Sequence, residues 1–350
     1  MKRLVRWINI LLVGITLLAF LAPSVSPEIF WPSGFLALFL PWLLLFNLLF
    51  VLGWAFFRRK EAFYSMIPLL LGWPFAQKLV SLFPSQSEYI GKTEVVLTTF
   101  NTQAMLGGPG DPGWVDMDEQ WTSIPALNLP DLLCLQEFTR NGKQRKVFLK
   151  WIAEHSRMKH QLSEPRHGLV ICSAFPMKKV AFQSFGNPHN GYLIADIEIE
   201  GRTVRLINVH LESNDVGRLA ETVMEKGRLQ EKETWIQVKG MAGRYRRSVK
   251  LRARQATEIR QLMAQSPHPV LLCGDFNDVP TSYVYQKLSR GMEDSFRQAG
   301  LGLGVTYRGK IPGLRIDYIL APESWAVSMH QVSDAAFSDH RAVNAVLLMP

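Results

Sequence analysis

An apolar run from Val270 to Cys273 stops at a short polar segment that contains Asp275 and Asn277. An apolar run without alternation is typical of a strand buried on both faces, whose polar end emerges at the edge of a sheet. Side chains two residues apart in an extended chain point the same way, so Asp275 and Asn277 can face one ligand while Phe276 packs behind them. Asp and Asn also form tight turns, and the short motif alone leaves a purely structural role open.

Other apolar runs are also followed by polar residues that could face a ligand. TEVVLTTFN ends at Asn101, DLLCLQE ends at Glu137, and TVRLINVHLES contains His210. Taken singly, each has an ordinary explanation as a turn former, an ion-pair partner or a hydrogen-bonded core residue. The residues that could meet at one site are Asn101, Glu137, His210, Asp275, Asn277, Asp317, Asp339 and His340.

The elements that must position these residues begin at about Lys92, where β-branched and apolar runs alternate with polar stretches. The glycine-rich segment 107–113 must form a loop, and 121–127 is a candidate helix. Many strands with helices between them, and strand faces that are often apolar on both sides, favour two packed sheets with helices outside. Further strands are expected at 168–173, 192–199, 203–213, 315–320, 326–332 and 342–348.

The chain opens with three apolar segments, at residues 4–21, 35–57 and 62–83. The first two have about the length of a membrane-spanning helix, whereas Pro68, Pro74 and Lys78 interrupt the third. A cleaved signal peptide is an alternative for the first segment, because a basic start precedes it and small residues follow it. We expect a membrane anchor of about three transmembrane helices in residues 1–87 and a separate domain in residues 88–350.

The net charge of +9 is shared unevenly, because +5 of it falls within residues 1–87. The basic composition is therefore partly a membrane signature and does not by itself indicate nucleic-acid binding. Basic clusters at Lys2–Arg6 and Arg58–Lys60 favour the cytoplasmic side of a membrane. We expect a multi-pass membrane protein in which the segment 62–83 also crosses, so that the second domain is extracytoplasmic. The alternative is that this segment does not cross, which would leave the second domain in the cytoplasm.

The three cysteines all lie in short apolar runs that are expected to be strands. Buried free thiols are therefore the default, and no disulfide framework is indicated. Transporter function is poorly supported, because the apolar segments carry no paired intramembrane charges and Lys78 has no partner there.

The motifs TFN, LQE, NVHL, GDFN, RIDYI and SDH follow one another in this order. Over about residues 92–348 this succession resembles the endonuclease/exonuclease/phosphatase family, the deoxyribonuclease-I-like phosphodiesterases, and most of all its membrane-anchored bacterial members. The resemblance implies an α/β (α+β) four-layer sandwich, in which two packed mixed β-sheets are flanked by helices. It also implies phosphodiester hydrolysis in residues 88–350, at a bacterial inner membrane.

In-line attack on a phosphodiester adds negative charge that a divalent cation can neutralise, and Mg²⁺ prefers hard oxygen ligands. The resemblance implies Mg²⁺, with Mn²⁺ as an alternative, and it assigns the metal to Glu137, Asn101 and Asp339. It assigns catalysis to His210, Asp275, Asn277, Asp317 and His340. Arg166 and His167 are candidates for binding substrate phosphate. Gln103 stands where some nuclease members place an acid, which leaves one or two metals open.

A basic stretch interrupts the motif series at residues 214–260, where twelve basic residues stand against six acids. It is either a solvated helix face or a surface for anionic lipid or nucleic acid. We expect a membrane-tethered, metal-dependent, nuclease-like phosphodiesterase whose partners are the bilayer and a phosphodiester substrate. A phospholipid or sphingolipid head-group phosphodiesterase and a non-catalytic membrane scaffold are the alternatives, and no protein partner can be inferred.

Overall fold

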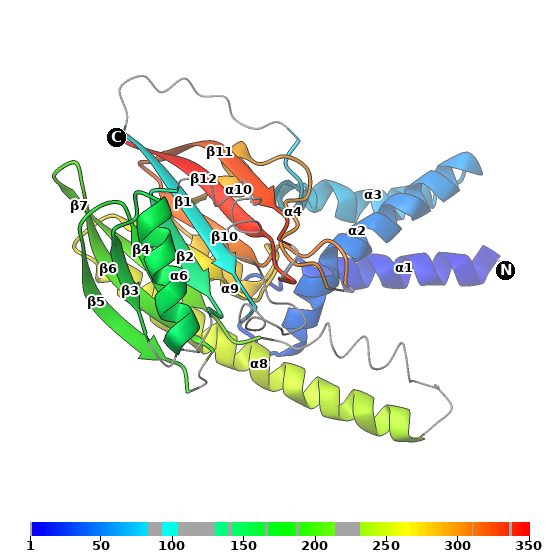
Figure 1. The fold of residues 1–350 in the computed structure, drawn as a ribbon. Coiled ribbons are helices and arrows are strands. Elements are labelled where there is room, and N and C mark those ends of the chain that lie inside the picture. Colours follow the sequence, from blue (N-terminus) through cyan, green and yellow to red (C-terminus); the bar gives the residue numbers. More distant parts are fainter. Residues whose placement is uncertain are drawn as a thin grey trace.

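The computed structural model describes residues 2–82, 93–103, 130–138, 142–164, 167–186, 189–213, 232–309, 311–335 and 338–350. Two six-stranded sheets face each other, and helices cover their outer faces (Figure 1). This is the predicted four-layer sandwich of two mixed sheets. The candidate helix at 121–127 lies outside the described residues.

The first sheet has the strand order β11-β12-β1-β2-β4-β3. Its central pair, β1 and β2, is parallel, and the strands around that pair run antiparallel. The carboxyl ends of β1 and β2 therefore open at the same edge. The strands are β1 Thr93–Asn101, β2 Leu132–Gln136, β3 His160–Ser163, β4 Val170–Ser173, β11 Ala326–Ser333 and β12 Ala342–Met349.

The second sheet has the order β5-β6-β7-β8-β10-β9 and repeats this plan, with β7 and β8 as its parallel pair. The strands are β5 Met177–Ser184, β6 Gly191–Ile199, β7 Arg202–His210, β8 Val270–Asp275, β9 Met292–Asp294 and β10 Asp317–Pro322.

Apolar side chains from both sheets form the central core, in which Leu97 and Leu132 of one sheet meet Leu206 and Leu271 of the other. A second core lies between the second sheet and helices α8 (Lys232–Ala264) and α9 (Tyr283–Ser289). A third core lies between the first sheet and α6 (Gly142–His155). The short helix α10 (Ser295–Ala299) completes the domain, and the cysteines are buried free thiols, as expected.

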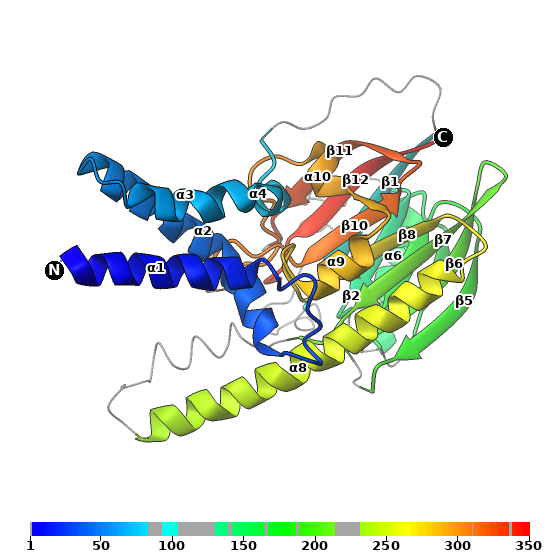
Figure 2. The same ribbon diagram turned by 180° about the vertical axis from the view of Figure 1, so that it is seen from behind.

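The N-terminal helices project from one side of the sandwich (Figures 1 and 2). They are α1 (Lys2–Ala19), α2 (Pro32–Phe56), α3 (Ala62–Leu71) and α4 (Trp73–Leu79). At their inner end, Thr281 donates its hydroxyl to the carbonyl oxygen of Ala37 at 2.8 Å. Arg315 donates to the carbonyl oxygen of Lys78 at 2.9 Å. The two-sheet sandwich and the N-terminal helices therefore share a hydrogen-bonded contact.

The expectation of several spans is supported for one helix. Within the described part of the chain, α2 alone is both long and apolar enough to cross a membrane. Helix α1 carries three cations at its start, and α3 has ten residues, about 15 Å, roughly half the hydrocarbon thickness. The third segment does not form one continuous helix, because the chain breaks at Gly72 between α3 and α4.

Candidate active site

The register of the second sheet sets three site residues side by side. His210 at the end of β7 pairs with Asp275 at the end of β8, and Asp275 pairs with Asp317 at the start of β10. Directly paired residues on adjacent strands point to the same face. The three side chains are also among the most buried polar groups, each no more than 2% exposed.

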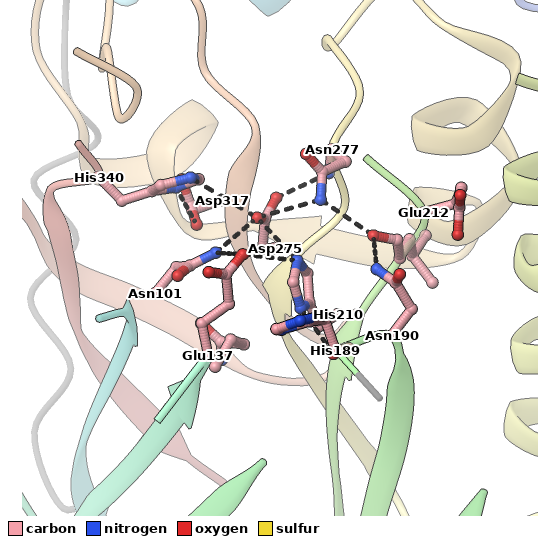
Figure 3. A network of polar contacts seen from close by, with 12 residues as sticks. Asn101, Glu137, His189, Asn190, His210, Glu212, Asp275, Asn277, Asp317 and His340 are labelled. Carbon is pink, nitrogen blue, oxygen red and sulfur yellow. Dashed lines mark hydrogen bonds and ion pairs between the residues drawn. The ribbon is translucent and has the colours of Figure 1, made fainter. Parts of the chain in front are cut away.

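The first sheet contributes Asn101 and Glu137 from the facing edge (Figure 3). Asn101 pairs with Gln136 across the parallel strands, and Glu137 follows with a φ of 48°, which turns its side chain out of the strand direction. The Nδ2 of Asn101 donates to Asp275 at 3.0 Å and lies 3.4 Å from Glu137 Oε1. One amide thus joins the carboxylates of the two sheets.

A sharp turn after β8 brings Asn277 back to Asp275. The backbone N–H of Asn277 donates to Asp275 Oδ1 at 2.8 Å, and its Nδ2 donates to Asp275 Oδ2 at 3.2 Å. Gly274 has a φ of 130°, and a Cβ there would lie 2.0 Å from the carbonyl oxygen of Val209. Only glycine fits at that position, which explains the residue before Asp275 in the GDFN motif.

His340 and Asp317 form a direct pair. The Nδ1 of His340 lies 2.9 Å from Asp317 Oδ2, and its Nε2 lies 3.8 Å from Asp275 Oδ2. Asp317 thereby fixes the imidazole ring so that Nε2 faces the site.

His210 approaches the same carboxylates from the second sheet (Figure 3). Its Nδ1 bonds to the carbonyl oxygen of His189 at 2.9 Å, so Nδ1 carries a hydrogen and Nε2 is directed to the site. Nε2 lies 3.6 Å from Glu137 Oε1 and 3.5 Å from Asp275 Oδ2.

Burial and mutual repulsion shape the electrostatics of this cluster. Burial, with the nearby Asp317 carboxylate, raises the pKa of Asp275 to about 6. For His340 burial acts to lower the pKa, but Asp317 and Asp275 outweigh it and raise the pKa to about 10. His340 is therefore an imidazolium at neutral pH, suited to donating a hydrogen bond to an anion.

Asp339 lies at the open side of the cluster. Its side chain is 35% exposed, its Oδ1 lies 4.0 Å from His340 Nε2, and its backbone N–H donates to Gln103 Oε1 at 3.1 Å. Burial raises the pKa of Asp339, and the neighbouring Glu137 adds to this effect although His340 opposes it. Gln103, which stands where some nuclease members place an acid, thus bonds to the backbone of Asp339.

The donor set fits a divalent cation. Glu137, Asp275, Asp317 and Asp339 supply four carboxylates around two imidazoles, which is a surplus of negative charge in a largely buried site. Ligand atoms of Asp275, Asp317 and His340 lie within 4.8 Å of one another, but there His340 Nδ1 is already bonded to Asp317. Glu137 and Asp339, 29% and 35% exposed, fit Mg²⁺ better because this ion retains several waters.

Of the two predicted phosphate-binding residues, His167 belongs to the described part of the chain. Arg166 lies outside the described residues. The ring of His167 packs against Phe182 with a centroid distance of 4.7 Å, and its carbonyl oxygen accepts from Arg145. Their role in substrate binding stays a prediction.

Three supporting residues were missed from the sequence. Ser338 donates to the carbonyl oxygen of Asn101 at 2.7 Å and joins the last motif to β1. The Thr306 hydroxyl accepts from the backbone N–H of Asp317 at 3.1 Å, and Asn190 donates to the carbonyl oxygen of Leu211 at 2.6 Å. Ser338 could have been found, because it belongs to the SDH motif, but Thr306 and Asn190 follow no strand signal.

With this geometry established, a family model described as the Endonuclease/Exonuclease/phosphatase family matches residues 99–340. The match spans more than half of the chain, and the chain belongs to this family of phosphodiesterase and nuclease hydrolases. A second model, described as a domain of unknown function, matches residues 2–79. A comparison with curated proteins found no match.

Solved structures with a similar fold include the human Nocturnin catalytic domain with bound sulfate anion, 16% identical, at a TM-score of 0.49 over 73% of this chain and 94% of that one. Sphingomyelinase C from Streptomyces griseocarneus is 16% identical, at 0.47 over 73% and 99%. A humanized TDP2 from D. rerio is 15% identical, at 0.47 over 73% and 98%. At this level of similarity they bear on neither substrate nor mechanism.

Proposed function

We propose that the chain is a membrane-tethered, Mg²⁺-dependent phosphodiesterase of the nuclease-like kind. The observation that carries this proposal is the surplus of carboxylates at the edge where the two sheets meet. Such a surplus is stable when a cation occupies the site, and phosphodiester hydrolysis is the family chemistry that uses one.

Glu137 and Asp339 would hold the metal, and Asn101 supports Glu137 through its amide. When bound, a divalent cation neutralises the charge that develops on the phosphoryl oxygens. Mn²⁺ would fit the same oxygen donors, and a second metal would need further ligands beside these carboxylates.

The other residues have separable roles. Asp275 accepts a proton from the attacking water, and the amide of Asn277 is 2.9 Å from the carbonyl oxygen of Leu211, which fixes its orientation beside that carboxylate. His340, held as an imidazolium by Asp317, donates from Nε2 to a non-bridging phosphoryl oxygen. His210 presents Nε2 to the same site from the second sheet, and its ring is held there by the hydrogen bond from Nδ1 to the carbonyl oxygen of His189.

Membrane tethering through α2 is supported by the side chains of the helical bundle. Its outer surface is apolar, with Trp7 67% exposed and Phe56 82% exposed. Its interior is polar, where Asn9 donates to Ser65 at 2.5 Å and Asn47 donates to Thr16 at 2.8 Å. An apolar exterior around interhelical hydrogen bonds is typical of helices packed in a bilayer.

The direction of the tether follows from its two ends. Ala37 near the start of α2 and Lys78 at the end of α4 both bond to the catalytic domain. If α2 crosses, the chain must therefore return through α3 and α4 to the same side. The end of the helical bundle away from the sandwich then carries the basic residues Arg58–Lys60 and Arg6. Arg6 pairs there with Glu61 at 2.5 Å. Positive charge at this end favours the cytoplasmic side of a membrane. The catalytic domain would be extracytoplasmic.

Lipid head-group hydrolysis is the second candidate, and one contact favours it. Ala22 and Ala37 of the anchor pack on Val279, two residues after Asn277. The loop that follows the catalytic aspartate therefore touches the start of the candidate span, which would hold the site close to head groups.

The test is hydrolysis by the full chain in lipid nanodiscs, with Mg²⁺ or with chelator. The panel comprises single- and double-stranded DNA, RNA, phosphatidylcholine, sphingomyelin and bis(4-nitrophenyl) phosphate. We expect Mg²⁺-dependent cleavage of at least one nucleic acid or the simple diester, lost in Asp275→Asn. Cleavage of the lipids alone would select the second candidate, and no cleavage of any member would contradict the proposal.

Topology has its own test. Alkaline phosphatase fused after Pro350 should be active, because that enzyme works outside the cytoplasm. A signal only from a cytoplasmic reporter at the same position would place the domain inside.

A further inference from the structure

Four basic side chains of α8 are exposed and lie close together in its N-terminal half. They are Lys239, Arg244, Arg246 and Arg247, and we name them the α8 cation face. No carboxylate among the described residues pairs with any of them. Arg252 and Arg254 on the same helix differ, because they bond to Asp278 at 3.0 Å and to Glu28 at 2.5 Å. The cation face is therefore free to bind an anion.

The cation face is fixed at the start of the candidate span. Tyr245, between Arg244 and Arg246, is buried, and its ring stacks on Phe35 of α2 at a centroid distance of 3.8 Å. Gly34 makes this approach close, because a Cβ there would lie 2.7 Å from the Tyr245 hydroxyl. The cations thus lie beside the first turn of α2, at the depth where a spanning helix enters the head-group layer.

The direction of α8 agrees with this placement. Its C-terminal half packs on the second sheet, whereas its N-terminal half extends beyond the sandwich toward the side from which α1, α2 and α3 project (Figures 1 and 2). The exposed cations are therefore carried on the anchor side of the domain.

We propose that the α8 cation face binds the phosphate groups of anionic phospholipids in the leaflet next to the catalytic domain. The proposal rests on the membrane tether proposed above. Lys and Arg attract anionic lipid surfaces, and their aliphatic stems let the charged ends reach the phosphate layer. Lipid is favoured over nucleic acid, because the Tyr245–Phe35 stack holds these cations at the bilayer whether or not a nucleic acid is present.

Such binding would orient the active site. Arg252, two turns beyond Tyr245, donates to the carbonyl oxygen of Glu212 at 2.6 Å and bonds to Asp278. Glu212 lies two residues after His210, and Asp278 follows Asn277. Through Arg252, a lipid contact on α8 would therefore help to position the loops that follow His210 and Asn277.

Hydrogen–deuterium exchange on the full chain tests the proposal. Exchange of residues 239–250 is compared in nanodiscs of phosphatidylcholine and in nanodiscs containing about one quarter phosphatidylglycerol. We expect at least threefold slower exchange with phosphatidylglycerol, reversed by high salt because the contact is electrostatic. The effect should vanish in Lys239→Gln/Arg244→Gln/Arg246→Gln/Arg247→Gln.

A matched control removes four exposed lysines that lie outside α8, Lys146→Gln/Lys150→Gln/Lys159→Gln/Lys178→Gln. This control should retain the phosphatidylglycerol effect in full. If both variants lost the phosphatidylglycerol effect equally, the effect would depend only on the net charge of the protein. That result would overturn a binding site on α8. Equal melting temperatures of the two variants exclude misfolding as the cause of a difference.

The remaining outcomes distinguish a failure of the lipid-site proposal from a failure of the proposed membrane tether or of the proposed hydrolytic activity. Insertion into both nanodiscs with identical exchange overturns the lipid site and leaves the tether and the activity intact. A chain that stays out of both nanodiscs overturns the tether and, with it, this site. Protection of residues 239–250 by a DNA oligonucleotide, but not by phosphatidylglycerol, assigns the cation face to nucleic acid and overturns the lipid proposal.

Discussion

Two buried ionic clusters lie close together along the chain, and they are built in opposite ways. The first is the site cluster around Asp275, Asp317 and His340, which has more carboxylates than cations. The second, the Arg315 cluster, is balanced: Arg315 bonds to Asp294 at 2.9 Å, and both side chains are 2% exposed. The RIDYI motif contributes to both clusters, with Arg315 in the balanced cluster and Asp317 in the site cluster.

Aromatic rings surround the Arg315 cluster. The guanidinium lies 4.4 Å from the ring centroid of Phe296 and 4.8 Å from that of Tyr318, and the Tyr285 hydroxyl donates to Asp294 at 2.6 Å. Burial acts to raise the pKa of Asp294, but Arg315 and that hydroxyl outweigh it and lower the pKa. Balanced charge makes a structural cluster, whereas the unbalanced site cluster has capacity left for a ligand.

Glu137→Gln should have the largest effect, because it removes a carboxylate proposed to hold the metal while keeping the shape of the side chain. We expect kcat/KM for Mg²⁺-dependent hydrolysis to fall about 10⁴-fold, about 5 kcal/mol. Steady-state kinetics over a Mg²⁺ titration measure this, with the exposed Glu198→Gln as the control. Full activity of Glu137→Gln at saturating Mg²⁺ would remove the metal assignment.

Arg315→Met should break the balanced cluster and leave Asp294 as an unpaired buried charge. The expected loss is about 4 kcal/mol in the free energy of unfolding. Urea unfolding of the chain in detergent measures it. Asp294→Asn combined with Arg315→Met should recover part of the loss, and a double variant as unstable as the sum of the single variants would argue against pairing.

Asp317 and His340 should act as one unit, because the carboxylate works by fixing the imidazolium. Asp317→Ala and His340→Ala are each expected to slow hydrolysis, and their coupling energy should be about 2 kcal/mol. Single and double variants compared by kcat/KM give this value. Losses that multiply in the double variant would show two independent residues.

His330 beside the Arg315 cluster should make stability depend on pH. Burial lowers the pKa of its imidazole to about 4, from an ordinary value of 6.5 in the unfolded chain. Its contribution is complete above pH 6.5 and is lost as the pH falls toward 4, at about 1.4 kcal/mol per unit. His330→Leu should flatten the measured slope of unfolding free energy over that range, and the exposed His160→Leu should not. Equal slopes for wild type and His330→Leu would contradict the prediction.

The smallest effect expected is a gain. Asp275→Asn removes one of the surplus carboxylates, so with chelator present the unfolding free energy should rise by about 1 kcal/mol, although activity is lost. Thermal unfolding with EDTA measures the change. A destabilised variant would mean that the site cluster is balanced without a cation, as the Arg315 cluster is.

Much of the fold was predictable, because strand signals are local. The apolar runs before Asn101, Glu137 and Asp275 became β1, β2 and β8, and the two-sheet sandwich with outer helices follows from their number and apolar faces. The third N-terminal segment, which Pro68, Pro74 and Lys78 interrupt in the sequence, forms two short helices that meet at Gly72, and the sequence did not locate that break.

The sequence by itself determined which residue types are available, since the order of the motifs places acids, amides and histidines after apolar strands. The tertiary structure decided their relations: that His340 is held by Asp317 23 residues earlier, and that Asn101 joins Glu137 to Asp275 across two sheets. It also decided that Arg315 turns away from the site to meet Asp294. These outcomes depend on strand register and on which groups are buried together, and distance along the chain carries neither.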